Sequence, residues 1–161
     1  MSNVSTAKGK YTFDFSNTKG MTNKNLTTWL RRFMLIMGNQ EYATKFKSKP
    51  LDITVRNSVD KVTLDFTADG DYAYRHNLRQ LTNKSSFLNY LLREMNGVFI
   101  YVDYVDYETG FDFIECGKSL IHVNNKVRVD IDAVEEELTK ERFIEYKAGT
   151  IDDWKNLGFD D

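Results

Sequence analysis

The sequence predicts a single α+β domain over residues 1–161, built on a largely antiparallel sheet of about six or seven strands with helices packed against it. Two observations predict this class. Strand-like segments occur in runs with helical segments between the runs, whereas a parallel sheet needs strands and helices in alternation. The chain is also long enough for one substantial core, with 161 residues of which 41% are hydrophobic. Its one proline, Pro50, leaves no proline-rich linker between two domains.

The chain begins with a polar segment, and we expect residues 1–9 to form a flexible tail. Residues 10–15 then alternate aromatic and polar side chains, as a half-buried strand does. This first strand is expected to end before Gly20, whose conformational freedom suits a turn.

The strongest helical pattern covers residues 22–37. Apolar side chains recur there at the three- and four-residue spacing of one helix face, and Thr22 or Asn23 is a suitable N-cap. The stripe consists of Leu26, Trp29, Leu30, Phe33, Met34 and Met37. A second short helix is expected over residues 39–47, ending before Pro50.

Two strands are expected next, over residues 51–56 and 59–67, with Asn57-Ser58 as the hairpin turn between them. Residues 69–82 fit a helix or a loop equally well. A helix is predicted over residues 85–96, because Ser85 or Ser86 can cap an apolar stripe that ends at Gly97.

A four-strand meander is expected over residues 98–131, with strands at 98–107, 111–116, 119–123 and 126–131. An acidic helix over residues 132–147 should follow, with Asp132 as its cap. Thr150 and Asp153 have the spacing of a capping box and predict a last helical turn that reaches Leu157.

Charge changes along the chain, although the whole chain carries a net charge of only −2. Residues 1–50 contain nine Lys/Arg and two Asp/Glu, a net charge of +7. Residues 51–97 contain six of each, and residues 98–161 contain seven bases and sixteen acids, a net charge of −9. Such asymmetry indicates a charged partner or the association of copies through complementary charged surfaces.

The sequence therefore predicts first a non-catalytic protein-interaction module, of an inhibitor or regulator kind, that presents an acidic and aromatic C-terminal surface to a basic partner. By analogy, small acidic proteins can also act as mimics of nucleic acid that present carboxylates to a phosphate-binding groove. Tyrosine is enriched in protein interfaces, which favours the aromatic hairpin after residue 98. The expected surface consists of Tyr101, Asp103, Tyr104, Asp106, Tyr107, Glu108, Glu135 and Glu136.

A metal-dependent hydrolase is a weaker alternative, and it depends on the register of the hairpin at residues 107–111. A two-residue turn at Glu108-Thr109 would place Asp103 and Asp106 opposite apolar residues. A three-residue turn would oppose like charges, which are destabilising unless a cation or base lies between them. That second register would give a divalent-metal set of Asp103, Asp106, Asp112 and Glu115.

Nucleic-acid binding through the basic N-terminal third is the other alternative. Its candidate residues are Arg31, Arg32, Lys45, Lys47 and Lys49. Aromatic residues of the 98–116 hairpin are poor candidates for base stacking, because the charges between them are acidic and would repel phosphate.

Other motifs favour a structural explanation, and no motif identifies a reaction. Gly117-Lys118-Ser119 lacks the earlier glycine and the following helix of a phosphate-binding loop, so we expect a turn between two strands. His122 falls in the middle of a predicted strand, where a structural role is expected, and His76 lies beside Arg75 in the ambiguous segment. Cys116 resembles a small buried hydrophobe more than a nucleophile. No cofactor is expected. The single cysteine and the polar N-terminus predict a cytoplasmic protein without a membrane segment.

Overall fold

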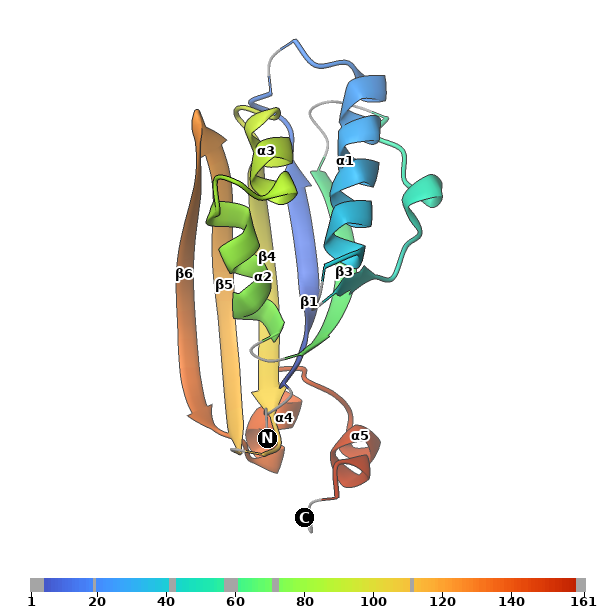
Figure 1. Ribbon diagram of the computed structural model, residues 1–161. Coiled ribbons are helices and arrows are strands. Elements are labelled where there is room, and N and C mark those ends of the chain that lie inside the picture. Colours follow the sequence, from blue (N-terminus) through green and yellow to red (C-terminus); the bar gives the residue numbers. More distant parts are fainter. Residues whose placement is uncertain are drawn as a thin grey trace.

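A computed structural model describes residues 5–18, 20–40, 43–56, 61–70, 73–110 and 112–158, except for the side chains of His76 and Asn77. The predicted α+β class is confirmed: one six-stranded sheet carries helices on both of its faces (Figure 1). The strand order is β2-β3-β1-β4-β5-β6, and every neighbouring pair is antiparallel. The strands are β1 Ser5–Asp14, β2 Thr44–Phe46, β3 Lys61–Gly70, β4 Phe99–Glu108, β5 Phe113–Asn124 and β6 Lys126–Glu137.

Three helices cover one face of the sheet, which we call the helix-covered face. They are α1 Asn23–Gly38, α2 Ala73–Thr82 and α3 Phe87–Arg93. Two short helices, α4 Lys140–Glu145 and α5 Ile151–Asn156, lie at the lower end of the molecule in Figure 1 and pack on the opposite face. A single 3-10 turn, η1 Pro50–Asp52, lies beside α1.

The main core lies between the sheet and α1–α3, where the apolar stripe predicted for the first helix is buried. Aromatic rings from β1 and α1 meet there edge to face, as Phe13 and Phe33 do with centroids 5.3 Å apart. The Trp29 indole N–H donates to the Leu91 carbonyl oxygen at 2.7 Å, which joins α1 to α3. Thr22 is the N-cap of α1 and accepts the Asn25 N–H at 3.1 Å, as its sequence position predicts.

A smaller second core lies under α4 and α5 on the opposite face. Phe143 is fully buried there, with its ring centroid 5.2 Å from that of Tyr107 and 5.4 Å from that of Trp154. The predicted capping box at Thr150 and Asp153 is confirmed and begins α5. The second core consists of Val105, Ile114, Leu138, Phe143, Ala148 and Trp154.

The expectation of a flexible tail over residues 1–9 is wrong for residues 5–9, which form the first half of β1; residues 1–4 lie outside the described part. β1 is central and pairs over ten residues with each of β3 and β4. Ser5 and Ala7 are fully buried, and a Cβ on Gly9 would lie 1.9 Å from the Asp103 carbonyl oxygen. Small side chains allow these close approaches, but they give no apolar pattern in the sequence.

Between α1 and β3 the expected elements are largely wrong. Thr44–Phe46 is the short edge strand β2 and not part of a helix over 39–47, because it pairs with residues 66–68 of β3. Residues 51–56 form η1 and an extended segment, not a strand. The expected turn at Asn57-Ser58 lies outside the described residues. The ambiguous segment 69–82 contains the end of β3 and the helix α2.

The predicted meander of four strands is a meander of three. Residues 111–116 and 119–123 were expected as two strands, but β5 runs unbroken from Phe113 to Asn124, so Gly117-Lys118-Ser119 is mid-strand and not a turn. The helix expected over 132–147 is wrong up to residue 137, because β6 continues to Glu137 by pairing with β5. Tertiary pairing thus overrides the helical propensity of the acidic residues. The turn at Asn124-Asn125 is confirmed, with Asn125 at φ 62°.

Candidate functional site

Strand alternation divides the acidic and aromatic hairpin between two faces. Tyr104, Asp106 and Glu108 point to the helix-covered face and are 4%, 1% and 3% exposed. Tyr101 and Asp103 point to the opposite, open face and are exposed, whereas Tyr107 is half-buried under Phe143. The prediction that these hairpin side chains form one exposed surface is therefore wrong.

The hairpin adopts neither expected register. Glu108 pairs with Phe113 across a four-residue loop, in which Asp112 has φ 50° and its carbonyl oxygen accepts the Leu138 N–H at 2.6 Å. Asp106 consequently lies directly opposite Glu115, and Asp103 lies opposite Lys118.

This register separates the residues of the metal hypothesis. Asp103 is on the open face, Asp112 is exposed in the loop, and only Asp106 and Glu115 lie together. Within the described ranges, no group of three or more His, Cys, Asp or Glu side chains is arranged to hold a metal ion.

The guanidinium group of Arg75 neutralises Glu115, one of the two buried carboxylates that lie opposite each other. Glu115 is 2% exposed and forms a two-pronged ion pair with Arg75 of α2, in which Arg75 Nε donates at 3.2 Å and Nη2 donates to the second oxygen. The Tyr104 hydroxyl also donates to Glu115 Oε1 at 2.9 Å. Glu135 of β6 lies on the other side of Glu115, so three carboxyl groups form one row across β4, β5 and β6.

Asp106 lies at the start of α2. Its Oδ2 accepts the Tyr74 N–H at 3.4 Å, and its buried Oδ1 has no partner among the described residues. Burial raises the pKa of Asp106 to about 6, and the nearby Glu115 and Glu108 charges add to this rise. The Ser5 hydroxyl accepts the Ala73 N–H at 2.8 Å, so β1 and β4 together hold the first turn of α2.

Two stacked tyrosines complete the interior of this region. The Tyr74 and Tyr104 ring centroids are 3.7 Å apart, and the Tyr74 hydroxyl is hydrogen-bonded to Ser119. Tyr104 lies between Gly9 and Gly117 on the neighbouring strands, where a larger side chain would collide with its ring or with the backbone. The contacts of Arg75, Tyr74 and Ala73 join α2 to the sheet, and the Tyr104–Glu115 hydrogen bond joins β4 to β5, so the cluster has a structural role.

The open face of the sheet is polar and balanced in charge. One row across five strands alternates in sign, so each charge has an opposite neighbour. The row consists of Asp65, Lys10, Asp103, Lys118 and Asp132. Tyr101 lies beside this row with the Lys61 ammonium 5.9 Å from its ring centroid. Balanced rows of this kind can contact water on one side of an antiparallel sheet and do not indicate a charged ligand.

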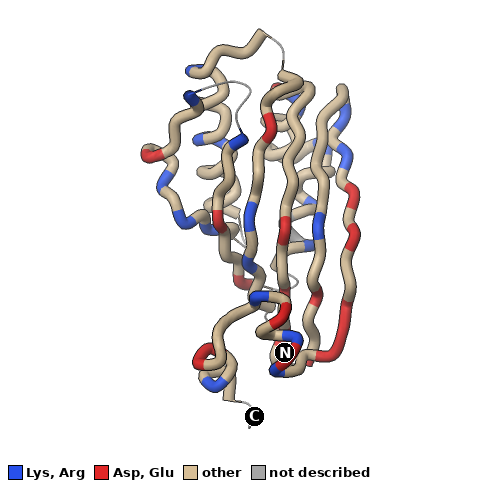
Figure 2. The backbone as a smooth tube through the Cα atoms, turned by 180° about the vertical axis from the view of Figure 1, so that it is seen from behind, with Lys and Arg blue, Asp and Glu red and all other residues tan. Residues whose placement is uncertain are grey.

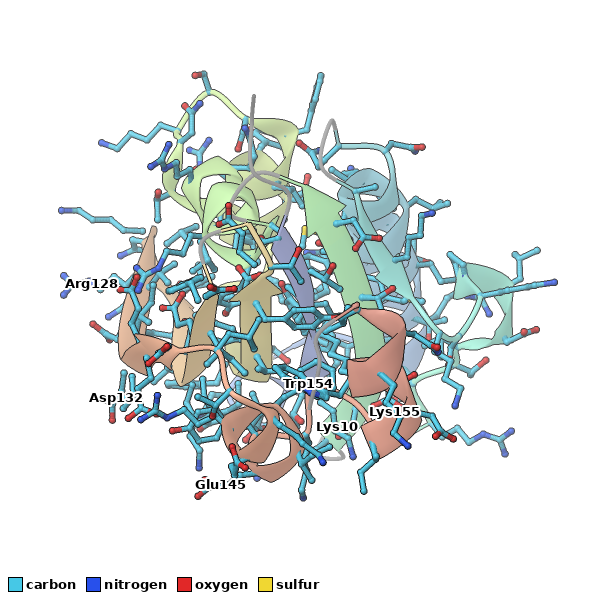
Figure 3. All side chains as sticks on the ribbon, turned by 90° about the horizontal axis from the view of Figure 1, so that it is seen from below. Lys10, Arg128, Asp132, Glu145, Trp154 and Lys155 are labelled. Atoms are coloured by element: carbon cyan, nitrogen blue, oxygen red, sulfur yellow. The ribbon has the colours of Figure 1, made fainter. Side chains whose placement is uncertain are left out.

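The exposed acids gather instead on the lower half of the edge strand β6 (Figure 2). Residues 130–137 contain five acids and no base: Asp130, Asp132, Glu135, Glu136 and Glu137. Glu136 is half-buried and pairs with Arg142 at 3.0 Å and with the Tyr146 hydroxyl. Asp132 and Arg128 lie at the free edge, whereas Trp154 of α5 points under the sheet (Figure 3). Of the expected acidic surface, Glu135 and Glu136 thus belong to this edge.

The basic residues of the nucleic-acid alternative do not form one surface. Arg31 Nε donates to the Ile53 carbonyl oxygen at 2.9 Å and holds the segment after η1, and Arg32 pairs with Glu94 at 3.2 Å. Lys45, Lys47 and Lys49 are exposed at and after β2, at the edge of the sheet opposite β6.

Sequence reasoning missed a different basic surface. The outer side of α3 carries Phe87, which is 83% exposed, and Tyr90, which is 58% exposed. Arg93 lies over the Tyr90 ring, 5.7 Å from its centroid. Phe87 lies four residues before Leu91, so its spacing predicts a position on the inner face of the helix, and its exposure contradicts that prediction. Only Tyr90, which is out of phase with Leu88, Leu91 and Leu92, gave a signal in the sequence.

The other ionisable residues considered for catalysis, Cys116 and His122, have surroundings that favour a structural role. Cys116 is half-buried, and burial raises the pKa of its thiol, which opposes a nucleophilic role. His122 stacks on Phe99 with centroids 5.7 Å apart, and its Nε2 is 4.0 Å from an Asp130 oxygen. The His76 side chain lies outside the description.

Comparison with protein families, with curated proteins and with solved structures finds no match for this chain. None of the helices in the described ranges has the length and apolar character needed to cross a membrane.

Proposed function

We propose that this protein is a non-catalytic protein-interaction module that binds a basic, extended segment of a partner protein along β6. The observation that carries the proposal is the combination of a long edge strand with five acids and no base over its residues 130–137. β6 has twelve residues, and the sheet ends at β6 in the part of the chain that the structure describes. An edge strand offers backbone N–H and C=O groups to an added strand, and its side chains select the sequence of that strand.

The side chains of β6 favour a basic partner strand. Asp130 and Asp132 point to the open face, and Glu135 and Glu137 point to the other face. Since an added strand also alternates, its Lys or Arg side chains would meet a carboxylate on either face. Ile131 and Val134, which are 39% and 53% exposed, would contact the aliphatic stems of those side chains.

Binding of a fluorescent peptide tests this proposal. The peptide alternates Lys with Val and Thr, and its anisotropy is followed at increasing salt. We expect saturable binding that weakens with salt, because the exposed charge pairs are screened. Amide hydrogen exchange should slow along β6 when the peptide binds, because strand addition closes the free edge.

A matched pair of triple variants separates a β6 site from general attraction to an acidic protein. Asp132→Asn, Glu135→Gln and Glu137→Gln together should abolish most binding. Asp65→Asn, Asp69→Asn and Asp103→Asn, on the open face, make the same change in net charge and should leave binding intact. Equal losses in both variants, salt-independent binding or no binding would each reject the proposal.

A further inference from the structure

Helix α3 exposes two aromatic rings where a surface helix usually carries polar side chains. Leu88, Leu91 and Leu92 are buried against the sheet, whereas Phe87 and Tyr90 are 83% and 58% exposed. Residues three apart lie on the same side of a helix, so the two rings share one surface. Large exposed apolar side chains that lie together indicate a binding surface.

Positive charge surrounds the two rings. Arg93 lies over Tyr90, and Arg93 Nη2 donates to the Lys84 carbonyl oxygen at 3.5 Å, so the Arg93 guanidinium lies beside the backbone of Lys84 in the turn before α3. Arg32 of α1 reaches the region through its 3.2 Å contact with Glu94. Three bases and one acid leave a net charge of +2 on this surface. We call Arg32, Lys84, Phe87, Tyr90 and Arg93 the α3 patch.

The wider surroundings of the α3 patch are also basic. Helices α1, α2 and α3 together contain six Lys/Arg (Lys24, Arg31, Arg32, Arg75, Arg79 and Arg93) and no Asp or Glu. The turn before β6 is held to the residues after α3, because the Asn125 N–H donates to Asn96 Oδ1 at 2.9 Å. The basic start of β6, with Lys126 and Arg128, therefore lies at the same end of the molecule, away from the acidic half of β6 (Figure 2).

We propose that the α3 patch binds a single-stranded nucleic acid. Unpaired bases stack on Phe87 and Tyr90, and Lys84 and Arg93 contact the phosphates between them. Exposed rings alternating with cations are the pattern of surfaces that bind single strands without sequence preference. The rings distinguish this ligand from an acidic peptide, which would need the cations alone, and from a duplex, whose bases are stacked on one another.

This site is independent of the β6 proposal, because the two surfaces share no residue and take ligands of opposite charge.

The test uses the whole protein and a short fluorescent oligothymidylate at low salt. Phe87→Ala with Tyr90→Ala should weaken binding by about tenfold or more for each ring, the effect of losing one stacked base. Tyr90→Phe should keep wild-type affinity, because it keeps the ring.

Charge variants test the phosphate contacts. Lys84→Gln with Arg93→Gln should weaken binding and reduce the slope of log affinity against log salt by about one to two, as expected for two lost phosphate contacts. Lys45→Gln with Lys47→Gln removes the same charge near β2 and should have no effect. Leu51→Ala is the matched truncation of an exposed apolar side chain, because Leu51 is 82% exposed and lies outside the patch.

A loss of affinity can be distinguished from a loss of folding. All the substituted side chains are exposed, so the unfolding midpoints of the variants should stay unchanged. Affinity that depends on Phe87, Tyr90, Lys84 and Arg93, and that a duplex or polyglutamate cannot match, supports the proposal. Equal binding of duplex, equal competition by polyglutamate, no effect of the ring variants or no binding at all would overturn it. Polyglutamate competition that depends on Arg93 would instead identify an acidic protein as the ligand.

Discussion

Asp106 and Glu115 lie directly opposite each other on β4 and β5, both buried, in a position where like charges destabilise a sheet. The two carboxyl groups differ in their hydrogen-bond and ion-pair partners. Glu115 has a guanidinium and a tyrosine hydroxyl as partners, whereas Asp106 has no cation: it has the Tyr74 backbone N–H at 3.4 Å and the nearby Ser5 hydroxyl. The pair is therefore tolerated because Arg75 neutralises one member and the other binds a proton more readily than usual.

Asp106→Asn should stabilise the protein at neutral pH. Because the pKa of Asp106 is raised to about 6 in the folded state, from an ordinary value of 3.8, the folded protein binds this proton more tightly. The free energy of unfolding should therefore fall as pH rises from about 4 through 6, by at most about 3 kcal/mol from this group.

Urea unfolding at a series of pH values measures this effect. The wild-type and Asp106→Asn curves should agree near pH 4 and separate above pH 6, with the variant more stable. Asp103→Asn, on the exposed side of the same strand, is the control and should follow the wild type. A variant that is less stable at pH 8 would show that the carboxylate is needed in its charged form.

Arg75→Met should destabilise the protein by about 3 kcal/mol near pH 8, because it leaves the buried Glu115 without its cation. Adding Glu115→Gln should recover much of this loss, since the uncompensated charge is then removed. Denaturant midpoints of the single and double variants give the comparison. Arg79→Met, at an exposed position later in α2, should change stability little; equal effects of Arg75→Met and Arg79→Met would contradict the role given to the ion pair.

Gly9→Ala should be among the most damaging small substitutions. Its Cβ would lie 1.9 Å from the Asp103 carbonyl oxygen, so β1 and β4 would have to separate, at a cost of about 3 kcal/mol or more. Gly38→Ala, at the end of α1 with no contact closer than 4.0 Å, should raise stability by up to about 1 kcal/mol. Thermal midpoints should move in opposite directions, and a neutral Gly9→Ala would disprove the close approach.

Phe143→Ala should loosen the second core more than the first. Removing a fully buried phenylalanine costs about 3–5 kcal/mol, and its ring contacts Tyr107 and Trp154. Amide hydrogen exchange should accelerate in α4 and α5 and change less in α1. Ile144→Ala, at the next and partly exposed position, serves as the control; uniform acceleration in both helical groups would show that the two cores unfold together.

The elements that could be predicted from the sequence are those with a clear local signal, either an apolar stripe or a capping residue. The stripe from Leu26 to Met37, the Ser86 cap of α3 and the Thr150 capping box are all found as expected. Elements with small or charged inward positions were missed. Ser5, Ala7 and Gly9 form a central strand because neighbouring strands cover them, and no local pattern encodes that.

The register of β4 and β5 could not be predicted from the sequence for a similar reason. The four-residue loop depends on Asp112 in the left-handed region and on its contact with Leu138, which is distant in sequence. The register decides which carboxyl groups face each other. With the four-residue loop, the candidate metal residues do not lie together. Burial of Tyr104, Asp106 and Glu108 likewise depends on α2, in a segment whose sequence fits helix or loop equally well.

The two sides of the sheet are unequal, since β2 has three residues and β6 has twelve. Among the described residues, the opposite edge of the sheet is β2, which pairs with three of the ten residues of β3. Pairing of one copy after another into a growing ribbon needs a second long edge strand there, and β2 is a short one. We therefore expect complexes formed through β6 to be closed and of fixed stoichiometry, with one partner segment for each copy of the protein.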